Sequence, residues 1–258
     1  MGETTGRAID GRPIWIDLST ADPEAAKLFY AKIFGWDYWT NPDPLYGGYV
    51  LARLADGDVA GISGLMSPEA PTAWTSYFGT SDAAALATRI AAAGGTVVVA
   101  PMVVGDQGTM LIFTDPTGAF TGAWQQDQMA GFGGKGPGTF RWTDLSARGV
   151  ERATPFYSSV FGWSAETYPM GEGQPPYTRY TIGTEPVGGA MEMSSMVPPE
   201  VPSYWLVYFA VADVAETLAK AIEAGGRAVM PRTEYAGGSY AIVGDPQGAV
   251  FAIMAEAT

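Results

Sequence analysis

The chain has 258 residues, of which 47% are hydrophobic and 16% charged, so it is long and apolar enough for one or two globular domains with buried cores. No apolar run reaches the roughly 18 residues that a membrane-spanning helix needs. The formal net charge of −13, from 14 basic and 27 acidic residues, excludes nucleic acid and anionic membrane surfaces as favourable partners.

The chain contains no cysteine and no histidine. Disulfides, thiolate nucleophiles, Fe–S clusters and Ser-His-Asp sites are therefore excluded, as are metal sites built on imidazole or thiolate. Acid–base chemistry must come from Asp, Glu, Lys, Tyr, Arg or a bound water. The N-terminal sequence MGETTGRAIDGRP lacks the apolar segment of a signal peptide, and this predicts a cytoplasmic protein.

The first half of the chain predicts two successive units of the order βαβββ. A strand over 14–19 leads into a helix that starts at Asp22-Pro23 and ends at Gly35, because Asp is a favoured N-cap, Pro fits the first turn and Gly the C-cap. Three strands complete this unit, over 37–40, 49–54 and 59–66. The order then restarts, with a strand over 74–80, a helix over 82–93 and strands over 96–104, 110–114 and 119–125.

The second half of the chain repeats the first. The segment WIDLS at 15–19 recurs as WTDLS at 142–146, an offset of 142 − 15 = 127, and the segment FGW at 34–36 recurs at 161–163 with the same offset. Helices are expected near 150–161 and 214–224. The sequence thus predicts a tandem duplication of four βαβββ modules, with domains at residues 1–130 and 131–258.

A glycine-rich segment at 129–138 has the composition of a flexible linker between the two halves. It contains the pattern G-x-G-x-x-G from Gly131 to Gly136. A dinucleotide-binding fingerprint should follow a strand and open a helix, whereas the residues that follow here, TFRWTDLS, favour a strand. We interpret the segment as a linker.

Several motifs carry a resemblance to a known family. They are DPEAAKLFY at 22–30, FGW at 34–36, the Gly-Gly pair at 94–95 and Asp-Pro-x-Gly at 115–118, within the repeated βαβββ order. Together they resemble the vicinal oxygen chelate superfamily of glyoxalase I, extradiol dioxygenases and bleomycin-resistance proteins, and more closely its two-domain actinobacterial glyoxalase-like or "hydroxylase"-labelled type. The resemblance implies an α+β fold, in which four βαβββ modules form two tandem glyoxalase/bleomycin-resistance-like domains with cup-shaped mixed sheets.

The resemblance also implies a divalent metal in the cup, held by His on first strands and by a carboxylate on last strands. Carried onto this sequence, these positions are Trp15, Thr75, Trp142 and Leu206 on first strands, and Gly64, Gly122, Glu192 and Ala252 on last strands. Only Glu192 could bind a metal, and a catalytic site needs three or more ligands, so we expect no metal and no other cofactor. An oxygen-only site from Asp144 and Glu192 is the alternative.

Alternation along the predicted strands places two sets of side chains inside the cups. The first set is Trp15, Asp17, Tyr77, Phe120 and Trp124. The second set is Trp142, Asp144, Glu192, Tyr208, Val250 and Met254. Aromatic walls with one or two carboxylates suit a planar, largely apolar molecule that carries a hydroxyl or an amine. Four other tryptophans are predicted to pack in the cores, namely Trp36, Trp74, Trp163 and Trp205.

From these features we expect a metal-independent member of the superfamily, a monomer or homodimer, that binds an aromatic or polycyclic small molecule in antibiotic sequestration or secondary metabolism. The alternative is a cofactor-free isomerase, cyclase or lyase in which Asp17 or Asp144 is a general base and a tyrosine hydroxyl stabilises an enolate, with Glu192 as a further catalytic candidate. A third possibility is a structural or partner-binding protein.

Overall fold

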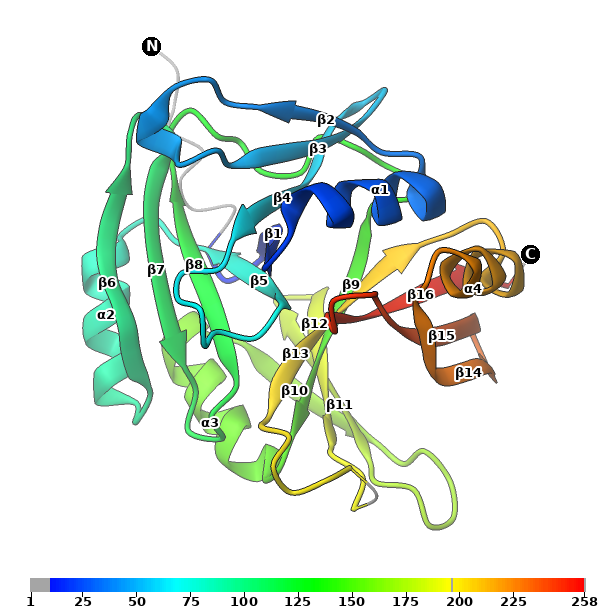
Figure 1. Cartoon of the computed structure of the whole chain (residues 1–258). Helices are drawn as coiled ribbons and strands as arrows, with labels where there is room; N and C mark the ends of the chain where they lie inside the picture. Colours follow the sequence, from blue (N-terminus) through cyan, green and yellow to red (C-terminus); the bar gives the residue numbers. More distant parts are fainter. Residues whose placement is uncertain (1–9, 196, 258) are drawn as a thin grey trace. The chain divides into compact units, whose positions relative to one another are not determined.

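The computed structural model describes residues 10–195 and 197–257 and contains four βαβββ modules (Figure 1). Module 1 consists of β1 (Pro13–Thr20), α1 (Pro23–Phe34), β2 (Asp37–Thr40), the 3-10 helix η1 (Pro44–Tyr46), β3 (Val50–Leu54) and β4 (Gly57–Gly64). Module 2 consists of β5 (Ala73–Gly79), α2 (Ala83–Ala92), β6 (Thr96–Val104), β7 (Gly108–Thr114) and β8 (Phe120–Gln126). Module 3 consists of β9 (Phe140–Ala147), α3 (Val150–Phe161), β10 (Ser164–Tyr168), β11 (Tyr177–Ile182) and β12 (Glu185–Glu192). Module 4 consists of β13 (Tyr204–Ala210), α4 (Val214–Glu223), β14 (Arg227–Tyr235), β15 (Gly238–Gly244) and β16 (Val250–Glu256).

All four modules share one pattern of strand pairing. In module 1, β1 pairs in parallel with β4, and β4, β3 and β2 continue as antiparallel neighbours. The first and last strands of the other modules are likewise parallel, and the remaining strands form antiparallel hairpins. The predicted mixed sheets and the α+β class are therefore confirmed module by module.

Local sequence explains where the helices begin and end. The Asp22 carboxylate accepts a hydrogen bond from the backbone N–H of Ala25, Pro23 occupies the first turn, and Gly35 ends α1 in the left-handed conformation with φ of 72°. Asp82 and Asp213 cap α2 and α4 in the same way. Helix α3 differs, because the residue before it is Gly149, which has no side chain with which to cap it.

The described residues form two compact units, and each unit joins one module from each half of the chain. Unit 1 contains residues 10–14, 76–130 and 143–205, which are mainly modules 2 and 3. Unit 2 contains residues 15–75, 131–142 and 206–257, which are mainly modules 1 and 4. Helix α2 packs against α3 in unit 1, and α1 against α4 in unit 2. The domain boundary at residue 130 stays a prediction, and residues 1–9 of the first predicted domain lie outside the described residues.

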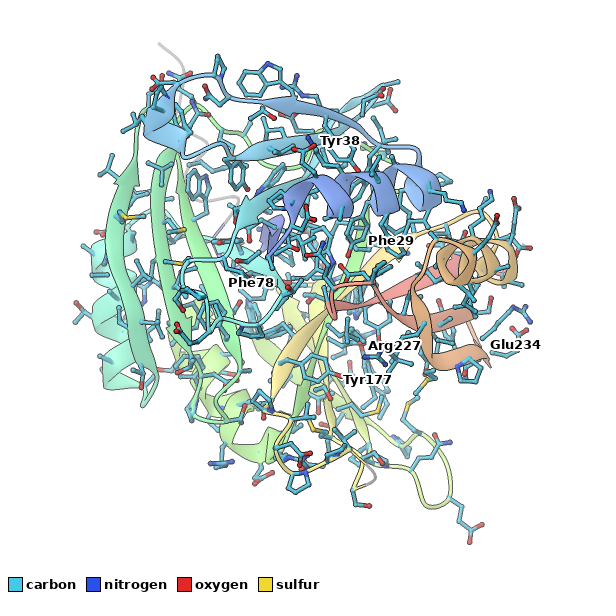
Figure 2. The ribbon with its side chains drawn as sticks, viewed as in Figure 1. Phe29, Tyr38, Phe78, Tyr177, Arg227 and Glu234 are labelled. Carbon is cyan, nitrogen blue, oxygen red and sulfur yellow. The ribbon has the colours of Figure 1, made fainter. Side chains whose placement is uncertain are left out.

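The core of unit 2 is built around a buried chain of hydrogen bonds. The indole N–H of Trp74 donates to the Tyr30 hydroxyl at 3.0 Å, and that hydroxyl donates to the Asp245 carboxylate, also at 3.0 Å. Phe29 of α1 (Figure 2) and Phe209 pack in the same cluster. Burial raises the pKa of Tyr30 well above its ordinary value, and the charge of Asp245 adds to the rise. The phenol therefore stays a neutral donor that ties α1 to the Asp-Pro-x-Gly turn of module 4.

The core of unit 1 repeats this arrangement. The indole N–H of Trp205 donates to the Tyr157 hydroxyl at 2.8 Å, which in turn donates to Asp115 at 3.1 Å. Phe78 (Figure 2) and Trp163 pack against these side chains. The prediction that Trp36, Trp74, Trp163 and Trp205 are core residues is confirmed, because each is at most 6% exposed and belongs to one of the two clusters.

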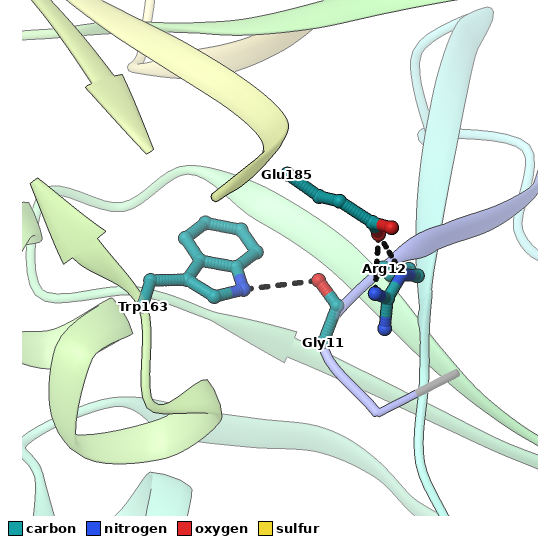
Figure 3. Close-up of polar contacts among 4 residues, drawn as sticks. All are labelled: Gly11, Arg12, Trp163 and Glu185. Carbon is teal, nitrogen blue, oxygen red and sulfur yellow. Dashed lines mark hydrogen bonds and ion pairs between the residues drawn. The ribbon is translucent and has the colours of Figure 1, made fainter. Parts of the chain in front are cut away.

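Trp163 also forms a hydrogen bond with Gly11, near the start of the described chain, within unit 1. Its indole N–H donates to the carbonyl oxygen of Gly11 at 3.0 Å, and next to this bond Arg12 forms an ion pair with Glu185 (Figure 3). The side chains of this ion pair are 31% and 64% exposed, so it contributes little to stability compared with the buried indole bond.

The glycine-rich segment is not a free linker over its whole length. The N–H of Gly133 donates to the carbonyl of Asp58, and the carbonyl of Gly138 accepts the indole N–H of Trp36 at 2.8 Å. Phe132 stacks on Phe140 with ring centroids 4.9 Å apart. This part of the prediction is wrong because backbone groups and an aromatic ring hold the segment on unit 2. The segment leads into β9 rather than a helix, as expected for a connection that does not bind a dinucleotide.

In the part of the chain that the structure describes, no helix combines the length and the apolar character needed to cross a bilayer.

Candidate functional site

Strand register identifies equivalent positions on the first and last strands of the modules. Asp17 of β1 is paired with Gly61 of β4, and Asp144 of β9 with Gly189 of β12. In the other two modules the pairs are Tyr77 with Gly122 and Tyr208 with Ala252. The last-strand counterparts of Gly122 are therefore Gly61 and Gly189. The estimate of Gly64 and Glu192 was wrong by three residues, because modules 1 and 3 lack the Asp-Pro-x-Gly turn that marks the register.

A tyrosine fills the space beside the last-strand glycine in three of the modules. A Cβ atom on Gly61 would lie 1.7 Å from the Tyr49 hydroxyl, and one on Gly189 would lie 2.0 Å from the Tyr177 hydroxyl. A Cβ on Gly122 would lie 2.3 Å from the ring of Tyr77. These distances are far below van der Waals contact, so any side chain at these three glycines would have to displace a tyrosine.

In module 1, three polar groups meet at this position. The indole N–H of Trp15 donates to the Tyr49 hydroxyl at 2.9 Å, and the hydroxyl lies 3.5 Å from the Asp17 carboxylate. Burial raises the pKa of Tyr49 well above its ordinary value, and the charge of Asp17 adds to the rise. Tyr49 is thus held as a neutral phenol against a carboxylate. Trp15 is 3% exposed and packs against Phe132, outside the core cluster of unit 2.

Module 3 carries the same pair in a tighter form. The hydroxyl of Tyr177 on β11 (Figure 2) donates a hydrogen bond of 2.7 Å to the Asp144 carboxylate. Glu192 does not join this pair. Its carboxylate accepts hydrogen bonds from the backbone N–H groups of Gly149 and Val150 at 2.9–3.0 Å, and so caps the N-terminus of α3. The predicted place of Glu192 beside Asp144 is therefore wrong, because β12 turns its final carboxylate toward the helix that lacks a cap of its own.

Module 2 contributes buried aromatic side chains to unit 1. Tyr77 and Trp124 are each 6% exposed and lie outside the core cluster, and the Tyr77 hydroxyl lies 3.8 Å from the sulfur of Met110. The ring of Trp124 lies against Gly108, where a Cβ would come within 2.6 Å of it. Phe120, which shares the strand, is 44% exposed. The first predicted set also includes Trp15 and Asp17, which belong to unit 2, whereas Tyr77, Phe120 and Trp124 belong to unit 1. The grouping of these five residues in one cup therefore stays a prediction.

Module 4 carries a row of tyrosines within unit 2. The ring centroids of Tyr208 and Tyr240 are 6.3 Å apart, and those of Tyr240 and Tyr235 are 6.2 Å apart. Tyr240 is the cross-strand partner of Met254. Met254 also lines a surface cavity of about 400 Å³, together with Phe140 and other residues. Trp142 belongs to the same unit, on β9, and Val250 begins β16.

The family model of the Glyoxalase/Bleomycin resistance protein/Dioxygenase superfamily matches residues 12–120 and 139–253. The chain belongs to this superfamily. The two matched segments coincide with the two halves of the duplication, so the resemblance seen in the sequence is confirmed.

Relatives of this superfamily chain cover nearly its whole length. The protein named "Putative glyoxylase CFP32" from Mycobacterium bovis is 36% identical over 250 residues, which cover 95% of this chain and 94% of the relative. The "Anthracycline biosynthesis protein DnrV" of Streptomyces peucetius is 34% identical over 264 residues, covering 96% and 94%. A solved Mn(II)-bound glyoxalase from Novosphingobium aromaticivorans matches with a TM-score of 0.68 at 15% identity, covering 96% of this chain and 83% of that one, and shows the shared fold.

The donor set of this superfamily chain does not fit a divalent metal of the kind named in that structure. The chain has no histidine, and at the equivalent positions of the first and last strands the paired residues are Asp with Gly, Tyr with Gly, or Tyr with Ala. Within residues 10–195 and 197–257, no three Asp or Glu side chains come together as a metal-binding group. A first strand here supplies at most one carboxylate, and a tyrosine hydroxyl lies next to it.

Two tyrosines, Tyr49 just before β3 and Tyr177 at the start of β11, were not predicted as site residues. A signal for them was present in the repeat. Tyr49 and Tyr177 are 128 residues apart (177 − 49), and so are Gly61 and Gly189 (189 − 61), so the tyrosine recurs together with the glycine that it covers. Tyr235 and Tyr240 were also missed. Alternation assigns a residue to one face of its own strand, and it does not tell which side chain of a neighbouring strand reaches it.

Proposed function

We propose that this superfamily member binds a planar aromatic or polycyclic small molecule without a metal, in antibiotic sequestration or secondary metabolism. The observation that supports this most directly is that three last-strand positions are glycines whose side-chain space is filled by Tyr49, Tyr77 and Tyr177, where the resemblance implies carboxylates. Where a metal site needs converging ligands, this chain has phenol groups beside single carboxylates. Phenols and indoles suit recognition of a flat ring system with polar edges.

The names of two relatives support the ligand class. DnrV of Streptomyces peucetius and DauV of Streptomyces sp. are both named as anthracycline biosynthesis proteins, and they cover 94% of their own length in the match. Anthracyclines are polycyclic aromatic compounds with hydroxyl and quinone oxygens. Aromatic side chains that belong to neither core cluster are the candidates for a ligand of that chemistry, namely Trp15 in unit 2, and Tyr77 and Trp124 in unit 1.

We expect 1,4-dihydroxyanthraquinone to bind and to quench the tryptophan fluorescence of the protein. Isothermal titration calorimetry measures the affinity, and N-acetyltryptophanamide at the same absorbance corrects for inner-filter loss. The quenching should be reduced in Trp124→Ala or Trp142→Ala. It should be kept in Trp39→Ala, because Trp39 is 40% exposed and its ring is covered by the Arg53 guanidinium. Elemental analysis of protein purified without chelator should find no stoichiometric metal. One tightly held Mn, Fe, Ni or Zn per chain, or no binding of the probe, would contradict the proposal.

A cofactor-free enzyme is the second candidate, and the contact of 2.7 Å between the Tyr177 hydroxyl and Asp144 is the observation that favours it. In such an enzyme the carboxylate removes a proton from carbon and the phenol donates to the enolate oxygen.

Asp144→Asn separates the two candidates. For a binding protein, we expect the dissociation constant of the probe to stay within about tenfold of the wild type, since a neutral polar anchor remains; tenfold corresponds to about 1.4 kcal/mol. For an enzyme, the same change abolishes turnover of a substrate while the complex still forms. The matched variant is Asp17→Asn in module 1. Loss of turnover with retained binding would replace the binding proposal by the enzymatic one.

A further inference from the structure

The surface cavity of unit 2 contains two cationic side chains, although the chain as a whole is strongly acidic. Lys135 and Arg141 both line it, in a chain with 14 basic and 27 acidic residues. Its one acidic lining residue is Glu256, which forms an ion pair with Arg141. The side chains of this pair are 47% and 66% exposed, so the pair is weak and an incoming anion can compete for the guanidinium.

Apolar and aromatic groups surround these charges. Phe140, Val211 and Met254 line the cavity, and Met254 is the cross-strand neighbour of Tyr240, which leads to the row of module 4 tyrosines. Tyr235, at the end of that row, interacts electrostatically with both members of the ion pair. Burial raises the pKa of its phenol, the charge of Arg141 opposes this rise, and the charge of Glu256 adds to it. The cavity and the tyrosine row are therefore neighbouring parts of one surface within unit 2.

We propose that this cavity recognises the anionic edge of an aromatic ligand, a carboxylate or an ionised phenol, with Arg141 as the charged anchor and Glu256 as an internal competitor. The proposal rests on the proposed function and specifies its ligand class. The apolar body of the ligand lies on Phe140 and Met254, and its anionic group accepts hydrogen bonds from the guanidinium, which is suited to two parallel bonds with a carboxylate.

Two probes of nearly equal shape test the proposal, anthraquinone-2-carboxylate and its neutral carboxamide. We expect Arg141→Gln to lower the affinity for the carboxylate probe about tenfold, as for loss of a charge-assisted hydrogen bond. The affinity for the carboxamide probe should stay within about twofold of the wild type. Glu256→Gln should raise the affinity for the carboxylate probe several-fold, because the side chain that competes for Arg141 is removed. The double variant should bind both probes alike.

The control variants are Arg232→Gln and Glu234→Gln on β14. Arg232 and Glu234 form an ion pair whose side chains are 46% and 66% exposed, closely matching the cavity pair, and neither residue lines the cavity. These variants change the net charge by the same amount and should leave both probes unaffected. The inference is overturned if the control variants change binding as the cavity variants do, or if Arg141→Gln weakens binding of both probes equally or of neither. In these cases the proposed function still holds as long as the wild type binds the probes. If the wild type binds neither probe, both are overturned.

Discussion

Replacing Trp74 with alanine is expected to lower the free energy of unfolding by about 3–5 kcal/mol, the range for truncating a large aromatic side chain in a core. Trp74 is 6% exposed and lies with its ring centroid 5.3 Å from that of Tyr30 and 5.1 Å from that of Phe209. Its indole N–H is also the donor to the Tyr30 hydroxyl. The change therefore leaves a cavity and removes one bond of the buried chain that ends at Asp245. Urea unfolding followed by circular dichroism measures the effect.

Trp124→Ala and Trp39→Ala are the comparison variants for this experiment. Trp124 is equally buried but lies outside both core clusters, so its loss should cost less stability and more ligand affinity. Trp39 is 40% exposed, and its loss should change stability by less than about 1 kcal/mol. If Trp74→Ala and Trp124→Ala are equally destabilised, then Trp124 is a core residue and its assignment to the binding surface is wrong.

Gly189→Ala is expected to destabilise the protein by about 1–3 kcal/mol, the usual cost of adding a carbon to a filled site. The new Cβ would lie 2.0 Å from the Tyr177 hydroxyl and 2.4 Å from an Asp144 carboxylate oxygen. Tyr177 must therefore move, which breaks its bond to Asp144. The variant should weaken binding of 1,4-dihydroxyanthraquinone if the pair contributes to recognition. Thermal melting and calorimetry measure the two effects.

Gly64→Ala is the matched control, because Gly64 also lies on a last strand, at the end of β4, and a Cβ there would meet nothing within 4 Å. We expect this variant to be neutral or slightly stabilised, since alanine restricts the unfolded chain. Combining Gly189→Ala with Tyr177→Ala removes the clash, so the double variant should lose less stability than the sum of the two single variants. A Gly189→Ala protein that behaves like Gly64→Ala would show that the tyrosine does not fill this space.

Most of the fold was predictable because local signals and the repeat agree. Asp22, Pro23 and Gly35 mark the two ends of α1, and the structure places the helix between them. The helix over 150–161 and the strand over 96–104 coincide with the prediction, since periodicity and glycine positions define both. Buried strands alternate with period two, so the assignment of Trp74 and Trp205 to the cores was also within reach of the sequence.

The candidate site was less predictable, for reasons of geometry. The register of a parallel strand pair depends on the loop between its strands, and modules 1 and 3 have no Asp-Pro-x-Gly turn to define it, which led to the displaced estimate of Glu192. The partner of a carboxylate is a tertiary property: Tyr177 is 33 residues from Asp144 and reaches it from another strand. The ion pair of Arg141 with Glu256 spans 115 residues and carries no local signal at all.

The pairing of module 1 with module 4, and of module 2 with module 3, has a consequence for synthesis on the ribosome. The core of unit 1 can close once Trp205 has emerged, because its clustered residues run from Phe78 to Trp205. The core of unit 2 includes Ile16 and Ile253, so the apolar face of α1 is made long before the module 4 residues that cover it. Such long closures slow folding and leave apolar surface uncovered meanwhile. Of the two cores, that of unit 2 therefore stays open longer during synthesis.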